Sequence, residues 1–310
     1  MANPQHPQST FDVVIVGGGP AGLAAALLLG RCLRRVVICD EGKPRNSGAA
    51  KFNGYLSRDD SSPSEFLDIG RQELQRYETV ELRRGKVIRA ERADRSFKVW
   101  TESGEAIIAR LLLLATGLED QLPEIKGFGE LYGKSVHSCP YCHGWECRGQ
   151  AMAIYGRDEP AANLAIELLQ WSKNLVLCTD GPPAWPGSRR EELERLGIVI
   201  DDRHLLSLEH EEEKLTGINF AGGGFLSRDA LFLMPKQCQR TSLAEGLGCE
   251  ISMEDGCLQC EDSGETAVPG LYVAGNTRQG QQLVIAAVAQ GTLAAAAMNN
   301  ALIDADTGTG

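Results

Sequence analysis

Two cysteines separated by two residues are the group in this chain best suited to chemistry. Cys139 and Cys142 flank Pro140 and Tyr141, and this spacing lets the two thiols lie one helical turn apart and close a small disulfide ring. Pro140 suits the first position of a helix, where a missing N–H costs nothing. A thiol at a helix N-terminus also has a lowered pKa and is a better nucleophile. The pattern therefore favours a redox-active disulfide.

The same spacing is also half of a zinc site, which needs about four ligands. A second pair, Cys257 and Cys260, lies in a hairpin-like segment, where a three-residue offset points the two side chains to opposite faces. Structural metal and inert thiols thus remain alternatives to redox chemistry, and we predict no metal site.

His143 follows the second cysteine directly. An imidazole can take or give a thiol proton near neutral pH, so we predict a catalytic role for it. The alternative is a histidine that merely caps the turn.

Composition limits the classes of protein to consider. The 310 residues suggest about two domains, and 43% hydrophobic with 24% charged residues is typical of globular proteins. The chain has 31 basic and 42 acidic residues, so its formal net charge is −11 at pH 7. This negative charge disfavours nucleic acid as a partner. We expect no signal peptide in the polar first residues and no membrane span, because no apolar run reaches about 18 residues. Ten cysteines in such a chain predict a reducing, cytoplasmic location.

The N-terminal elements predict a dinucleotide site. A β-rich run at 11–16 leads into a glycine turn at 17–22 and then an alanine- and leucine-rich helix, which is the context that G-x-G-x-x-G requires. Gly17 makes the tight turn, Gly19 lets the backbone approach a pyrophosphate, and Gly22 lets the helix pack on the strand. The next strand ends at Asp40, which can bind ribose hydroxyls.

Further elements follow the same plan. We expect a helix at 66–74, strands within 85–101, an apolar strand at 111–114 that runs into Ala115, Thr116 and Gly117, a strand at 270–276 and a final helix at about 282–298. We interpret the charge run at 209–213 as a solvated turn and residues 304–310 as a frayed tail.

A second strand–turn–helix unit has an altered turn. A strand at 151–155 precedes the turn at 156–161, in which Asp158 takes the place of the second glycine. A side chain there blocks a pyrophosphate and a carboxylate repels it. Arg189 and Arg190 lie too far along to be assumed readers of a 2′-phosphate.

The motifs together resemble the low-molecular-weight thioredoxin reductase family of FAD flavoproteins. The Gly17–Gly22 turn with Asp40, the Ala115–Gly117 turn, the Cys139–Cys142 pair and the Gly275–Asn276 segment with Gln282 and Leu283 occur in family order. The resemblance implies an α/β fold of two Rossmann-like three-layer domains. The FAD-binding domain would comprise 1–118 and 243–310, and an inserted, degenerate pyridine-nucleotide-like domain would comprise 119–242 and carry the disulfide.

The resemblance also assigns residue roles. Cys142 would face the flavin C4a and Cys139 would attack the substrate disulfide, while His143 stands where the family has an acid. Asn276 replaces the family's aspartate near the ribityl chain, and FAD binding should survive because Asn both donates and accepts. The expected FAD contacts are Gly17, Gly19, Pro20, Ala21, Gly22, Asp40, Glu41, Arg45, Asn46, Asn53, Val87, Ala115, Thr116, Gly117, Gly275, Asn276, Gln282 and Leu283.

We therefore predict an FAD-dependent dithiol–disulfide oxidoreductase that uses NADPH poorly. Its partner would be a thioredoxin-like protein or a small dithiol or disulfide, and the family resemblance implies a homodimer. Ferredoxin, a second FAD near Tyr141 and Trp145, or oxygen would replace NADPH, and a basic patch of Arg31, Arg34 and Arg35 could dock an acidic ferredoxin. The alternatives are a conventional NADPH-dependent thioredoxin reductase and a non-enzymatic flavin redox sensor.

Overall fold

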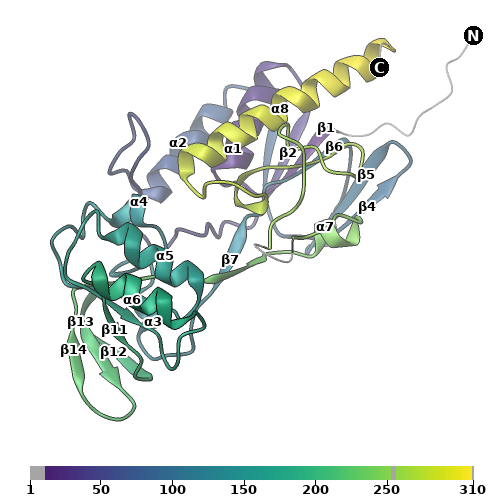
Figure 1. Cartoon of the computed structure of the whole chain (residues 1–310). Coiled ribbons are helices and arrows are strands. Elements are labelled where there is room, and N and C mark those ends of the chain that lie inside the picture. The colour runs from purple at the N-terminus through teal and green to yellow at the C-terminus, as the bar shows by residue number, and fades with distance from the viewer. Residues whose placement is uncertain (1–10, 253–255, 309–310) are drawn as a thin grey trace, which may run out of the picture. The chain divides into compact units, whose positions relative to one another are not determined.

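The computed structural model describes residues 11–252 and 256–308. It divides into two compact units: unit 1 takes in the described parts of 1–45, 64–119 and 237–310, and unit 2 comprises 46–63 and 120–236. The chain passes between them in β7 (Leu118–Gln121) and β16 (Lys236–Gln239), which pair as a two-stranded sheet (Figure 1). Both units are mixed α/β structures with Rossmann-like sheets, as predicted.

Unit 1 is built on a seven-stranded sheet in the order β3-β2-β1-β6-β5-β4, with β17 also pairing with β6. The β1–β2, β2–β3, β1–β6 and β6–β17 pairs are parallel, and β4–β5 and β5–β6 are antiparallel. The strands are β1 (Phe11–Val16), β2 (Val36–Asp40), β3 (Val80–Arg84), β4 (Val87–Ala93), β5 (Ser96–Thr101), β6 (Ala106–Leu114) and β17 (Leu271–Val273).

The helices of unit 1 cover the sheet. Buried residues of α1, α2 and α8 pack against alternate residues of β1 and β2 on one face, while α7 packs with the residues that face the other way. The bounds are α1 (Pro20–Arg31), α2 (Pro63–Leu74, which begins at the last residue of unit 2), α7 (Leu243–Gly246), the 3₁₀ turn η1 (Gly275–Thr277) and α8 (Val284–Thr307). Strand residues are buried on both faces, which explains the nearly continuous apolar runs in β1, β2 and β6.

Unit 2 has a parallel five-stranded sheet in the order β11-β10-β9-β15-β8. One face packs on α5 and α6, and the other packs on α3 and the antiparallel β12-β13-β14 sheet. The elements are α3 (Phe128–Leu131), β8 (Val136–His137), α4 (Pro140–His143), β9 (Met152–Tyr155), α5 (Glu159–Leu168), β10 (Leu175–Cys178), α6 (Gly187–Arg195), β11 (Val199–Asp201), β12 (Leu205–Glu211), β13 (Lys214–Phe220), β14 (Phe225–Ser227) and β15 (Ala230–Leu233).

The division differs from the expected boundaries at residues 46–63, at residue 119, which falls in unit 1, and at residues 237–242. Residues 46–63 group with unit 2 because Gly48 lies against Tyr132 and Gly133, and Asn53 bonds to Cys142. Residues 237–242 group with unit 1. The assignment of unit 1 to FAD and of unit 2 to a second nucleotide stays a prediction.

The frayed tail expected at 304–310 is wrong for 304–307, because α8 continues through these residues, and residues 309–310 lie outside the described part of the chain. Asp306 forms ion pairs with Arg34 (2.9 Å) and Arg110 (2.7 Å), so the last turn has polar partners that a sequence pattern does not reveal. The charge run at 209–213 also differs from its interpretation, because Glu209–Glu211 belong to β12 and only the end of the run forms the hairpin turn.

The packing of α1 on α8 predicts a cost for one added methyl group. A Cβ built on Gly291 of α8 would lie 2.0 Å from the carbonyl oxygen of Ala21 in α1, so the helices must separate to admit it. We expect Gly291→Ala to lower the free energy of unfolding by about 2–3 kcal/mol, despite a helix-propensity gain of about 1 kcal/mol. Urea unfolding measures this.

The matched control is Gly187→Ala at the start of α6, where a built Cβ meets nothing within 4 Å. It should leave the urea midpoint unchanged or raise it. Equal midpoints for the two variants would contradict the close helix contact.

Candidate active site

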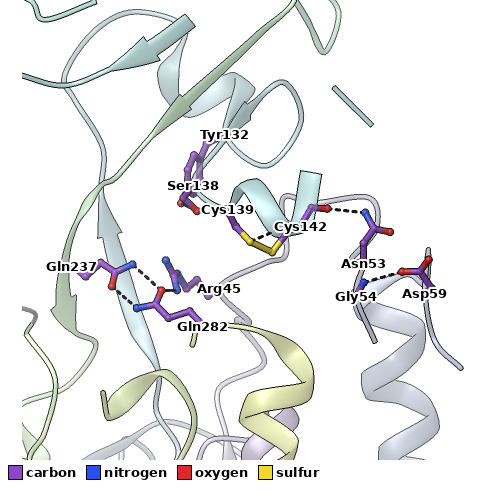
Figure 2. Close-up of a disulfide and its surroundings, with 10 residues drawn as sticks. All are labelled: Arg45, Asn53, Gly54, Asp59, Tyr132, Ser138, Cys139, Cys142, Gln237 and Gln282. Carbon is purple, nitrogen blue, oxygen red and sulfur yellow. Dashed lines mark hydrogen bonds between the residues drawn. A yellow bond between two sulfur atoms is a disulfide. The ribbon is translucent and has the colours of Figure 1, made fainter. Parts of the chain in front are cut away.

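The two predicted cysteines are joined in unit 2. Cys139 and Cys142 form a disulfide with their Cα atoms 5.3 Å apart, across the single turn α4 (Figure 2). Cys139 is the N-cap of this turn, Pro140 takes its first position as predicted, and the main-chain N–H of Cys142 donates to Cys139 Sγ at 3.1 Å. An N–H aimed at this sulfur stabilises negative charge on it after reduction.

The segment 46–63 supports the disulfide from one side. The side-chain amide of Asn53 donates to the carbonyl of Cys142 at 2.8 Å, and the next residue, Gly54, donates to Asp59 (Figure 2). The side chain of Asn53 thus holds the main chain of the disulfide turn, and its expected contact with FAD stays a prediction. Asn46 belongs to the same unit.

A polar chain lies on the other flank of the disulfide turn. The hydroxyl of Tyr132 donates to Asp120 at 2.8 Å and lies 3.1 Å from the hydroxyl of Ser138, the residue before Cys139. Tyr141 and Trp145 are about two-thirds exposed. Tyr141 meets the ring of Trp171 edge-on, and the guanidinium of Arg148 lies 4.1 Å from the ring centroid of Trp145.

His143 stacks on a second histidine that the sequence analysis missed. The rings of His143 and His137 lie 4.2 Å apart at 18°, and neither Nδ1 has a hydrogen-bond partner among the described residues. Burial lowers the pKa of His143, while Glu146 and the main chain of Cys139 partly oppose this effect. The lowered pKa keeps this imidazole neutral at pH 7, the form that can accept a thiol proton.

His137 is more deeply buried, in β8 beside Phe232 of β15. Burial lowers its pKa to about 3, with a smaller contribution from His143. In the sequence, His137 is marked only by its place two positions before Cys139, and that place does not predict that its ring stacks on His143.

The first glycine turn in unit 1 matches its predicted geometry. Gly17 has φ +108° and a Cβ there would lie 2.3 Å from the carbonyl of Ala115, while a Cβ on Gly22 would lie 1.9 Å from the carbonyl of Gly17. A Cβ on Gly19 meets nothing within 4 Å, and no side chain caps the α1 N-terminus, which also carries Pro20 and Ala21. This open N-terminus has the shape and polarity that a pyrophosphate requires.

Two further predicted segments of unit 1 meet near this turn. The main-chain N–H of Gly117, next to Thr116, donates to the hydroxyl of Thr277 at 2.9 Å, and a Cβ on Gly275 would lie 3.0 Å from Ala21 Cβ. Asn276 lies between Gly275 and Thr277 in η1. The return turn, the closing segment and the start of α1 are therefore neighbours, and the residues fit an FAD site.

Other predicted FAD contacts are already engaged. Asp40 accepts from the N–H of Gly18 (3.1 Å) and pairs with Arg71 (3.3 Å), and Glu41 pairs with Lys43.

Near the start of α8, the guanidinium of Arg45 donates to the side-chain oxygen of Gln282 (Figure 2). The side-chain amides of Gln282 and Gln237 each donate a hydrogen bond to the other. Leu283 is the N-cap of α8. The side chain of Val87 is buried in the core, so only its main chain could reach a ligand.

The second glycine turn, in unit 2, is closed where the first is open. Asp158 is the N-cap of α5, and its carboxylate accepts from the N–H of Ala161 at 3.2 Å. Arg189 pairs with Glu159 and Glu192, and Arg190 pairs with Glu194 and Asp202. At the end of β10, Asp180 accepts from Tyr155 and from the N–H of Leu205.

The burial of His137 predicts how stability varies with pH. Its pKa is about 3 when folded against 6.5 ordinarily, so below pH 6.5 the unfolded chain binds a proton that the folded chain does not. This part of the stability is complete above pH 6.5 and falls as the pH drops toward 3, by about 2 kcal/mol between pH 6.5 and 5. His137→Phe should reduce the slope of urea midpoints measured across this range and leave the part due to His143, while His210→Gln on the exposed edge of β12 should retain the whole slope. An unchanged slope in His137→Phe would contradict the assignment.

Comparisons with known proteins agree with this geometry. Residues 11–291 match the model of the pyridine nucleotide-disulphide oxidoreductase family. Thioredoxin reductase sirT of Leptosphaeria maculans is 28% identical, with 96% of each chain covered. Among solved structures, HlmI is 36% identical with a TM-score of 0.93, covering 99% of this chain and 97% of that chain. A putative thioredoxin reductase TrxB from Bacillus anthracis is 32% identical with a TM-score of 0.90, covering 96% and 99%. The chain therefore belongs to the pyridine nucleotide-disulphide oxidoreductase family, among its low-molecular-weight thioredoxin reductase-like members, and is a flavin-dependent disulfide oxidoreductase.

Proposed function

We propose that the Cys139–Cys142 disulfide exchanges electrons with a dithiol or disulfide partner, and that NADPH is a poor donor. The observation that carries this proposal is the contrast between the two glycine turns. The N-terminus of α1 has no side-chain cap and open space at Gly19, whereas Asp158 caps α5 with a carboxylate. A negative charge on those N–H groups competes with a phosphate and repels it.

The chain's own residues suit the thiol steps. FAD, when bound, would supply or accept the electron pair that opens or closes the disulfide. The N–H of Cys142 would stabilise a Cys139 thiolate, which supports Cys139 as the thiol that attacks a partner. Neutral His143, held by the His137 ring, would accept the proton that a partner thiol loses.

The partner that we propose is a thioredoxin-like protein or a small dithiol or disulfide. The relatives named thioredoxin reductase support the first of these. Exposed Tyr141 and Trp145 offer aromatic contact surface near the disulfide to either class. We also keep the homodimer and the reducing, cytoplasmic location as parts of the proposal. Among the described residues, no helix is long and apolar enough to cross a membrane.

Three electron partners could replace NADPH: ferredoxin, a second FAD or oxygen. The basic patch proposed for ferredoxin is largely engaged, since Arg34 bonds to Asn299 and Asp306, Arg31 bonds to Tyr77, and Arg35 lies over Phe11. This weakens the argument for ferredoxin. Counting the flavins released per chain on denaturation distinguishes the second FAD, because the relay requires two.

A conventional NADPH-dependent reductase remains the second candidate because Arg157 stands exposed in the α5 turn. A guanidinium at that position could attract a phosphate despite Asp158.

Replacing either sulfur of the disulfide tests the thiol chemistry. We expect Cys142→Ser and Cys139→Ser each to reduce turnover of an aromatic disulfide probe to below about 1% of the original rate, because one thiol cannot complete the exchange. The assay uses holoenzyme whose flavin is reduced with dithionite. Cys147→Ser, which changes a buried thiol nearby, should retain turnover. Turnover that survived in Cys142→Ser would refute the mechanism.

Replacing Asp158 tests the donor. Anaerobic stopped-flow with micromolar NADPH should bleach the flavin slowly in the original chain and at least tenfold faster in Asp158→Gly, which removes both the cap and the charge. Asp158→Asn keeps a good helix cap and removes only the charge, so it should raise the rate of flavin bleaching less than Asp158→Gly does. Fast bleaching in the original chain would favour the conventional reductase.

A further inference from the structure

The second C-x-x-C pair of the sequence lies outside the site described above. Cys257 and Cys260 belong to a segment that folds back on residues 249–252 of unit 1, with Ile251 opposite Leu258 as an antiparallel bridge. Cys260 and Cys249 are thiols that form no disulfide in this structure. Which two of these three cysteines could form a disulfide depends on how the two strands of this hairpin are aligned.

Two hydrogen bonds fix that register. The N–H of Ser252 donates to Cys257 at 2.8 Å, and the N–H of Gln259 donates to Glu250 at 3.4 Å. These bonds flank the Ile251–Leu258 pair, which is therefore a non-hydrogen-bonded pair. Such pairs alternate with hydrogen-bonded ones along an antiparallel ladder.

Extended by two residues beyond the Ile251–Leu258 bridge, the same register would set Cys249 opposite Cys260. This would again be a non-hydrogen-bonded position, at which the Cα atoms of antiparallel strands lie ~4.5 Å apart and the side chains are closest. Disulfides join Cα atoms about 4.4–6.8 Å apart. The extended register is therefore compatible with a disulfide between these two cysteines.

Strand alternation separates this pair from the third cysteine. Cys249, Ile251, Leu258 and Cys260 share one face of the hairpin, and all four pack on the same core cluster of unit 1. Cys257 points to the opposite face, so the obvious C-x-x-C partner of Cys260 is the wrong one.

The hairpin supports a turn that was predicted to contact the flavin. The N–H of Leu258 donates to the carbonyl of Thr277 at 2.9 Å, and the amide of Gln239 donates to the carbonyls of both Gly256 (2.7 Å) and Thr277 (3.0 Å). Thr277 ends η1, which holds Gly275 and Asn276. We propose that Cys249 and Cys260 form a second disulfide under oxidising conditions, and that this bond fixes the hairpin beneath the Gly275–Thr277 turn.

The oxidant is a low-molecular-weight disulfide such as oxidised glutathione. Burial raises the pKa of both thiols, and this effect is partly opposed by a hydrogen bond with Thr266 at Cys249 and by Arg278 at Cys260. Either thiol can therefore react first, and the steps are the same with the two exchanged; here Cys260 is the attacking thiol. Its thiolate attacks one sulfur of the oxidant, the S–S bond breaks, and one glutathione thiolate leaves. Cys249 then gives up its proton, attacks the Cys260 sulfur of the mixed disulfide and releases the second glutathione. Two protein thiols are oxidised by two electrons and one glutathione disulfide is reduced to two thiols.

Peptide mapping of the full-length holoenzyme tests the bond. The protein is incubated with oxidised glutathione, quenched with N-ethylmaleimide and cut with a Glu-specific protease. Cleavage after Glu245, Glu250, Glu254 and Glu261 separates Cys249, in peptide 246–250, from Cys257 and Cys260, in peptide 255–261. We expect these two peptides to be joined.

Two variants identify the partner within peptide 255–261. The cross-link should persist in Cys257→Ser and vanish in Cys260→Ser. A bond within peptide 255–261, or three maleimide-labelled cysteines after oxidation, would overturn the proposal.

A stability measurement tests what the bond does. Oxidised Cys257→Ser should melt about 2–8 °C higher than its reduced form, because the bond closes a short loop in the unfolded chain. Cys257→Ser/Cys260→Ser, treated identically, is the control and should show no such rise. An unchanged melting temperature despite a mapped cross-link would refute the role in fixing the hairpin.

Discussion

The absence of side chains at the start of α1 is the constraint on which unit 1 depends. A Cβ at Gly17 would strike the return turn at Ala115, one at Gly22 would strike Gly17, and one at Gly291 would strike Ala21. Strand β1, helix α1 and helix α8 can therefore lie in direct backbone contact only because these positions are glycine. The same turn has open space at Gly19 and no side-chain cap from the described residues, so small residues serve both the packing of the unit and its capacity to hold a phosphate.

Unit 2 repeats the strand–turn–helix plan with the opposite chemistry at its helix terminus. Asp158 satisfies an N–H of α5 from within the chain, and Arg189 and Arg190 are held by acids of the same unit. The sheet of this unit instead positions His137 at the end of β8, directly before the disulfide turn. In unit 2 the candidate reactive groups therefore gather around the disulfide and the two stacked imidazoles, and not at the N-terminus of α5.

Local patterns were enough to predict much of this structure. The glycine turn, the apolar strands and the cysteine spacing each act over a few residues, so the α/β fold, the disulfide and the tight turn at Gly17 could be predicted. Contacts between distant segments could not. The bond from Asn53 to Cys142 joins residues 89 positions apart, and the stack of His137 on His143 depends on side-chain packing that no periodicity encodes. The extra turns of α8 likewise depend on Arg34 and Arg110.

The bond from Asn53 to Cys142 has a consequence for anyone who exchanges parts between relatives. The disulfide-bearing half of this molecule is not one continuous stretch of gene, because residues 46–63 fold with 120–236. A chimaera that transplants only the longer stretch would pair a foreign loop with the native sulfur turn and leave the carbonyl of Cys142 without its amide donor. Recombination between family members should therefore succeed when both stretches travel together from one parent.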